Sequence, residues 1–413
     1  SDDFCPKHLN SRRVLAARSK YQPPIAKRFT SKTNAPTTYN QTMNPLEIWV
    51  PAHLLLKNQR PCPLLMHLSE PDTEPQLLFW NQLREILPKV VQVNFFNDLG
   101  EVAKNGVVVM PHDAKEWLAH GQFNQVRRYV RHILATGRTV VTFALGIEYE
   151  PLPGELAFIT SAYRSKREKA LPLPSWLFDI GSEVTSIGKP AVPSVTFMGN
   201  TKYHGRIGVV LNRLPLPHRL MAHLTSNRAV GRALPLNCRF ALARWLRRKA
   251  VNVTRNASQL KTHLVELDNY FVYSEEERKK LRADFLRSIR ENAYALCMRG
   301  DANGDYRTYE ILSAGRIPVI VDTNLWFPDL EGLSWQDFCV FVPVAELDSI
   351  GQKVAAFHER TTEESFQAKC QMAREAFEQL MPHRYIRHIV RQIEQRVAIQ
   401  NADAQATRQL VAH

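Results

Sequence analysis

The segment 293–322 constrains the fold more than any other part of the chain. An apolar run, Ala293–Met298, leads into a loop rich in Asp, Asn and Gly, and a helix-like segment follows over 305–314. Gly315 then separates that segment from a second apolar run at Ile317–Val321. Short apolar runs are typical of buried strands, and a Gly after a periodic segment marks a helix end. The segment therefore predicts a strand–loop–helix–strand unit of a parallel α/β sheet.

The loop of this unit is where a ligand is expected. In open α/β sheets ligands bind beyond the carboxyl ends of the strands, which is where Arg299 and the loop Gly300–Gly304 lie. Arg307 would occupy the first helical turn, where a cation is disfavoured unless an anion lies nearby. Glu310, one turn further, can accept two hydrogen bonds from a vicinal diol such as a ribose. These residues predict a pocket for a phosphorylated nucleoside; the alternative is an exposed ion pair between Arg307 and Glu310 beside an ordinary turn.

The same residues resemble the C-terminal region of exostosin-type glycosyltransferases. The family pattern is roughly C-x-R-G, a short loop, R-x-x-E, a small-residue turn and I-P-V. This chain has CMRG at Cys297–Gly300, RTYE at Arg307–Glu310 and IPV at Ile317–Val319. SVTFMG at Ser194–Gly199 stands where the family has the F-x-G strand that opens its nucleotide-binding domain. The resemblance extends over about 190–345.

Two positions depart from the family pattern. Met298 stands where the family often has Pro, and Asp305 stands where it often has a small hydroxyl residue. An acidic residue beside phosphates would repel them unless it caps the helix. The phosphate contact is therefore expected to depend on the role of Asp305.

The resemblance implies an α/β fold with two Rossmann-like domains facing a cleft, the GT-B-like glycosyltransferase architecture, with C-terminal helices packing back. It also implies a UDP-sugar donor, a saccharide acceptor and inversion at the anomeric carbon. Arg299, Gly300 and Arg307 would bind the donor, Glu310 would hold its ribose, and the turn at Gly199 would approach it. No Asp-X-Asp triplet occurs in the sequence, so we expect no metal, and positive side chains with a helix N-terminus would stabilise the leaving group.

Inversion requires one general base near the acceptor hydroxyl. Several residues at expected strand ends and loops qualify, namely His112, Asp113, Glu148, Glu150 and Asp301. We assign Asp113 as the catalytic candidate because it sits at the end of a strand-like run. An Asp at this position is an equally good helix N-cap.

Strand-like and helix-like segments alternate in the first part of the chain, which predicts a parallel sheet. The expected strands are Leu46–Val50, Cys62–Leu68, Val90–Phe96, Gly106–Met110 and Arg138–Leu145. We divide the chain into a basic, loosely ordered arm (1–44), an N-terminal Rossmann-like acceptor domain (45–188), a C-terminal Rossmann-like nucleotide-sugar domain (189–372) and a C-terminal helical segment (373–413).

The chain is strongly basic, with a net charge of +14 and a sequence pI of about 9.6. Nucleic acid, an anionic membrane surface and an anionic oligo- or polysaccharide acceptor would each match this charge, and a basic surface without a partner is the alternative. If the chain is a glycosyltransferase, we expect no nucleic acid as a partner. The competing hypothesis is a non-catalytic basic binding protein for an anionic glycan or nucleic acid, and a third is a glycosyltransferase fold that has lost activity. The densest basic cluster, Arg244–Lys249, indicates either a solvated helix face or a contact with an anionic polymer.

The six cysteines are scattered without C-x-x-C spacing, which favours reduced thiols and a cytosolic setting. No run of eighteen or more apolar residues and no apolar signal core occurs. We expect a cytoplasmic protein or one peripheral to a membrane, or a Golgi-lumenal protein if a membrane anchor was removed.

Overall fold

The structure is a computed structural model of the chain. It describes residues 44–411 except for 58, 71–77, 168–169, 177–178, 203–216, 227–235 and 268–273. The predicted arm at 1–44 lies outside the described residues, apart from residue 44.

The first sheet contains six parallel strands in the order β2-β1-β3-β4-β5-β6. Its strands are β1 (Leu46–Pro51), β2 (Val91–Phe96), β3 (Val107–Val109), β4 (Thr139–Ala144), β5 (Leu156–Ile159) and β6 (Leu171–Pro172). The connecting helices are α1 (Leu78–Val90), α2 (Ala114–Ala119) and α3 (Phe123–Ala135). Buried valines fill β3, and all six residues of β4 are buried, because a parallel sheet is covered on both faces.

One strand predicted for this sheet is wrong. The segment expected as a strand at Cys62–Leu68 is instead a 3₁₀ helix, η3 (Pro63–Leu68). Its first four residues are buried like those of a strand, which explains the misleading apolar run. Pro63 has no N–H to donate to a ladder, and its fixed φ suits the first turn of a helix.

The second sheet contains five parallel strands in the order β11-β10-β9-β7-β8. These are β7 (Ser194–Asn200), β8 (Lys261–Leu267), β9 (Tyr294–Cys297), β10 (Ile317–Asp322) and β11 (Val340–Pro343). The helices of this part are α5 (His218–Ser226), α7 (Leu236–Arg255), α8 (Glu275–Glu291), α9 (Tyr306–Ser313), α10 (Trp335–Phe338), α11 (Ile350–Glu359) and α12 (Glu363–Gln379). The predicted unit at 293–322 is confirmed as β9, α9 and β10, with Ile317 paired to Tyr294.

In each sheet the strand order reverses between two neighbouring strands, which are the first and the third strand of that sheet along the chain. The reversal lies between β1 and β3 in the first sheet and between β7 and β9 in the second. Ligands of doubly wound sheets bind at such switch points, beyond the carboxyl ends of the strands. The predicted fold class, α/β with two Rossmann-like sheets, is confirmed.

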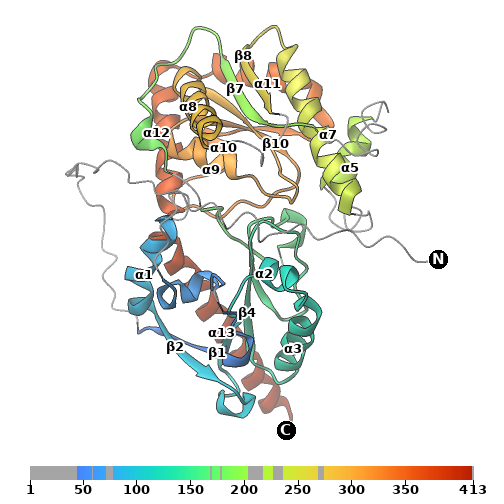
Figure 1. Cartoon of the computed structure of the whole chain (residues 1–413), viewed down its shortest axis with the longest axis vertical. Helices are drawn as coiled ribbons and strands as arrows, with labels where there is room; N and C mark the ends of the chain where they lie inside the picture. The colour runs from blue at the N-terminus through green and yellow to red at the C-terminus, as the bar shows by residue number, and fades with distance from the viewer. Residues whose placement is uncertain are drawn as a thin grey trace. The chain divides into compact units, whose positions relative to one another are not determined.

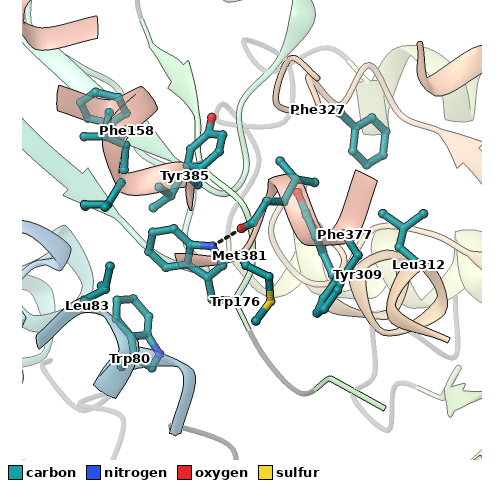
Figure 2. Packing of buried hydrophobic residues seen from close by; sticks show 14 of the residues in the cluster. Trp80, Leu83, Phe158, Trp176, Tyr309, Leu312, Phe327, Phe377, Met381 and Tyr385 are labelled. Atoms are coloured by element: carbon teal, nitrogen blue, oxygen red, sulfur yellow. Dashed lines mark hydrogen bonds between the residues drawn. The ribbon is translucent and has the colours of Figure 1, made fainter. Parts of the chain in front are cut away.

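The predicted return of the C-terminal helix is confirmed as well. Helix α13 (Pro382–Val411) lies along α1 and contacts β4 of the first sheet (Figure 1). The hydroxyl of its Tyr385 donates to the Pro172 carbonyl at 2.8 Å, and Ile389 is fully buried. Trp176 donates its indole N–H to the Leu380 carbonyl at 2.6 Å (Figure 2). The core of the first sheet is therefore completed by residues far along the chain.

Candidate functional site

The switch point of the second sheet is surrounded by arginines. β7 ends at Asn200, and its carbonyl accepts hydrogen bonds from Arg244 Nη1 and Arg247 Nη1, both at 3.2 Å. Arg247 Nε donates to the Arg299 carbonyl, just beyond β9, at 2.9 Å. Helix α7 thus bridges the carboxyl ends of β7 and β9 with two guanidinium groups.

These two arginines differ in their surroundings. Arg244 forms an ion pair of 3.1 Å with Asp301, a residue of the loop after β9. Arg247 is held by backbone carbonyls, and burial together with repulsion from Arg244 lowers its pKa to about 10. Arg247 remains charged near neutral pH, so an anionic group at this switch point would be attracted to it.

Helix α9 begins at this loop because Asp305 caps it. The carboxylate of Asp305 accepts from Arg307 N at 3.0 Å and from Thr308 Oγ1 at 3.1 Å. Burial raises the pKa of Asp305 above its ordinary value. The residue that departs from the family pattern thus serves as the N-cap.

Arg307 and Glu310 form an ion pair of 2.8 Å on α9. Glu310 is buried, with 8% of the residue exposed, so the pair is not the exposed one of the alternative hypothesis. Arg307 also donates to the Met198 carbonyl at 3.1 Å, and its guanidinium lies 3.9 Å from the centroid of the Phe285 ring. A carboxylate has about four acceptor sites, so the pair leaves Glu310 able to bind hydroxyl groups.

Arg299 points into the protein. Its guanidinium donates to the Thr225 carbonyl at 2.6 Å, to Glu148 Oε1 at 3.2 Å and to the Asp301 carbonyl at 3.2 Å. Neighbouring Gly300 closes the loop by donating its N–H to the Gly304 carbonyl at 2.7 Å. Arg299 therefore fixes the loop in this structure, and a direct contact of its side chain with a donor stays a prediction.

Gly199 is the penultimate residue of β7, so it lies at the same switch point as Arg299 and Gly300. A Cβ built on Gly199 would lie 3.0 Å from the Phe197 ring, and one on Gly300 would lie 3.3 Å from the Gly304 carbonyl. Both positions favour the smallest residue. The structure thus brings Gly199, Gly300, Arg307 and Glu310 to one end of the second sheet.

The switch point of the first sheet holds His112 and Asp113. His112 is buried: its Nε2 accepts from Leu56 N at 2.8 Å, and its Nδ1 lies 2.9 Å from the Arg60 carbonyl, to which it donates. Burial lowers the pKa of His112, and both ring nitrogens are engaged, so it is excluded as a general base in this state.

Asp113 is the N-cap of α2 and accepts from Lys115 N at 2.6 Å and Glu116 N at 3.3 Å. Burial raises the pKa of Asp113 to about 6. The catalytic role assigned to it stays a prediction, with capping as its observed structural role. Among the other candidates, Asp301 pairs with Arg244 and Glu148 with Arg299.

Sequence reasoning missed Arg244 and Arg247 as members of the site. Both belong to the basic cluster 244–249, but the structure divides that cluster: Arg248 is exposed and Lys249 lies 5.6 Å from the Trp245 ring centroid. The three-residue spacing of Arg244 and Arg247, which places them on one helical face, is the signal that could have separated them.

Within the described ranges, no cluster of three or more His, Cys, Asp or Glu side chains could hold a metal ion. The helices in that part of the chain include none that is both long and apolar enough to cross a membrane. The five cysteines in the described part of the chain are unpaired thiols, and Cys62, Cys297 and Cys339 are buried, in agreement with reduced core thiols.

Comparison with known proteins leaves the family open. No protein family model matches the chain, and no curated protein matches it. The chain is similar in structure to a glycosyltransferase from Rickettsia africae, with 9% sequence identity and a TM-score of 0.33 over 85% of this chain and 99% of that one. Similarity at this level establishes neither a family nor an activity.

Proposed function

We propose that this chain is an inverting, metal-independent glycosyltransferase that moves a sugar from a UDP-sugar to a saccharide acceptor. The observation that carries the proposal is the buried Arg307–Glu310 pair on α9, at the switch point of a doubly wound sheet. A buried carboxylate beside a helix N-terminus and guanidinium groups matches a nucleoside diphosphate, which presents a diol and an anion.

Each group at the switch point has a distinct role in this proposal. Glu310 accepts hydrogen bonds from the two ribose hydroxyls. Arg307 and Arg247, with the N–H groups at the start of α9, bind the diphosphate and stabilise the charge that develops on the leaving group. Gly199 and Gly300 leave their backbone open to the donor because they have no side chain, and a Cβ at either position would make a tight contact with Phe197 or Gly304.

Asp113 is the proposed general base for the acceptor hydroxyl. It lies beyond β3 at the switch point of the first sheet, and its pKa of about 6 lets it be ionised near neutral pH while remaining a stronger base than an ordinary carboxylate. An anionic oligo- or polysaccharide acceptor, or peripheral contact with an anionic membrane surface, would match the net charge of +14.

The first experiment is a thermal-shift and calorimetric titration of the chain with UDP, ADP, GDP and CMP in the presence of a chelator. A ligand that binds only the native state raises its stability, so a shift confined to UDP supports the donor site. Glu310→Gln is the matched variant and should reduce that shift. Absence of a shift with every nucleotide overturns the proposal.

Turnover is tested separately by measuring UDP release from a panel of UDP-sugars with candidate saccharide acceptors. Release that requires the acceptor supports transfer, and the anomeric configuration of the product tests inversion. UDP binding without release from any sugar favours the non-catalytic binding protein instead.

A further inference from the structure

One carboxylate oxygen of Glu148, a residue that follows β4 of the first sheet, is hydrogen-bonded to the loop that follows β9. Glu148, four residues after β4, accepts three hydrogen bonds at its Oε1. The donors are Tyr163 Oη at 2.9 Å, Arg299 Nη2 at 3.2 Å and the backbone N–H of Asn303 at 3.0 Å. Two of these donors belong to the strand end and loop that precede α9.

The loop is fixed at further points around this oxygen. Asn303 is fully buried, and its Oδ1 accepts from Thr323 Oγ1 at 2.7 Å. A Cβ built on Gly304 would lie 2.9 Å from the Thr160 carbonyl, beyond β5 of the first sheet. The loop 299–304 is therefore hydrogen-bonded to Thr323 and to Glu148, and Gly304 passes close to the Thr160 carbonyl.

Removal of the Glu148 carboxylate would leave three donors without this acceptor, two of them in the segment before α9. The Asn303 N–H is part of a buried residue, and a buried N–H without an acceptor is strongly unfavourable. Arg299 is also buried, and Glu148 is its ion-pair partner. Arg299 would keep its bonds to the Thr225 and Asp301 carbonyls, whereas the Asn303 N–H would need another acceptor. The conformation of the loop around Asn303 therefore depends on residue 148.

We propose that Glu148 is a positioning residue that holds the loop 299–304, and with it the start of α9, in the conformation that binds the anionic part of the donor. It is not the general base, because its Oε1 is engaged by three donors and its side chain is only 14% exposed. The effect on donor affinity rests on the proposed function, whereas the effect on loop order does not.

The test compares Glu148→Ala, Glu148→Gln and the matched control Glu275→Gln, which alters an exposed ion pair with Arg278 on α8. Amide hydrogen exchange of the peptide covering 299–305 reports loop order, and calorimetry reports UDP affinity. We expect Glu148→Ala to accelerate exchange in this peptide at least ~10-fold and to weaken UDP binding about 10-fold or more. Glu148→Gln keeps one acceptor oxygen and should show a smaller change of the same kind, and Glu275→Gln should show none.

The outcomes separate the alternatives. Loss of UDP release in Glu148→Gln, with unchanged UDP affinity and unchanged exchange of 299–305, identifies a general base and overturns the positioning role. A lower melting temperature with unchanged loop exchange and affinity also overturns it, because the residue then only stabilises the fold.

If the unaltered chain does not bind UDP, faster exchange in the variants still supports the loop role while the proposed function fails. If Glu148→Ala does not fold, Glu148→Gln alone decides.

Discussion

Arg307 and Glu310 lie one turn apart on α9 and form an ion pair in which the carboxylate is the more buried partner, with side chains 22% and 11% exposed. Phe285 and the Met198 carbonyl hold the guanidinium from the other side. The ion pair leaves acceptor positions of the Glu310 carboxylate unused, because a carboxylate has about four of them. The pair is thus held in one arrangement at the switch point, which is the geometry on which the proposed function depends.

Glu310→Gln should weaken UDP binding by about 10- to 100-fold, because hydrogen bonds to a charged acceptor contribute about 1.5–3 kcal/mol. Calorimetry with UDP and with 2′,3′-dideoxy-UDP checks the cause: the substitution should have little effect on the dideoxy compound, which has no ribose diol. Equal weakening of both ligands would contradict the ribose assignment.

Glu310→Ala adds a loss of stability to the loss of affinity, since it leaves Arg307 partly buried without its carboxylate. We expect the free energy of unfolding to fall by about 1–3 kcal/mol, less than for a fully buried pair because Arg307 keeps its bond to the Met198 carbonyl. Urea denaturation of the two Glu310 variants separates this effect from binding.

Arg244→Ala and Arg247→Ala should each weaken UDP binding about 10-fold or more while leaving uridine binding unchanged, because only the diphosphate needs the positive charge. Raising the salt concentration should reduce the difference between each variant and the unaltered chain, because both arginines are only partly buried. Arg248→Ala, which removes an exposed arginine of the same helix, is the matched control and should bind like the unaltered chain. A larger effect at Arg248 would indicate a general surface charge instead of a site.

Gly304→Ala should destabilise the chain by about 1–3 kcal/mol, because the new Cβ would lie 2.9 Å from the Thr160 carbonyl and the backbone would have to move. Gly188→Ala is the control, since its Cβ would meet Glu363 at 3.7 Å, an ordinary contact. Thermal unfolding of both variants measures the difference. Equal melting temperatures would show that the loop 300–304 can shift freely.

The pKa of Asp113 predicts a pH dependence of stability. Burial raises this pKa to about 6, so the native state binds the proton more tightly than the unfolded state, in which the pKa is near 3.8. The contribution of Asp113 to the free energy of unfolding therefore falls as the pH rises from about 4 to about 6 and is constant above that range. Asn caps helices as well as Asp does, so Asp113→Asn should remove this slope and be at least as stable near neutral pH. Urea denaturation at several pH values compares the two chains.

The same substitution tests the proposed base. UDP release should rise with pH as Asp113 loses its proton, with a midpoint near the pKa of about 6. Asp113→Asn should lower the turnover number by about 10²- to 10⁴-fold with UDP affinity retained. Turnover near that of the unaltered chain would exclude Asp113 and direct the search to Glu150.

The unit β9–α9–β10 was predictable because its signals are local: apolar runs, a capping Asp and a Gly stop within 30 residues. The switch-point positions of Gly199 and Gly300 followed from the strand-end rule once the strands were recognised. The direction of Arg299 could not be predicted in this way, because its partner Glu148 lies 151 positions earlier in the sequence. The local pattern also gave a wrong prediction at Pro63–Leu68, because the apolar residues of this buried 3₁₀ helix resemble those of a buried strand.

Helix α13 has a consequence for the order in which the chain folds during synthesis. Trp176 bonds to the Leu380 carbonyl and Tyr385 to the Pro172 carbonyl across 204 and 213 positions, and Ile386, Ile389 and Ile393 belong to the same core cluster as Leu83 of α1. A nascent chain that has emerged only through β6 would leave the apolar side of α1 exposed to water. The first sheet, although translated first, can complete its core only after the whole second sheet has left the ribosome, which makes it the part most dependent on protection from aggregation.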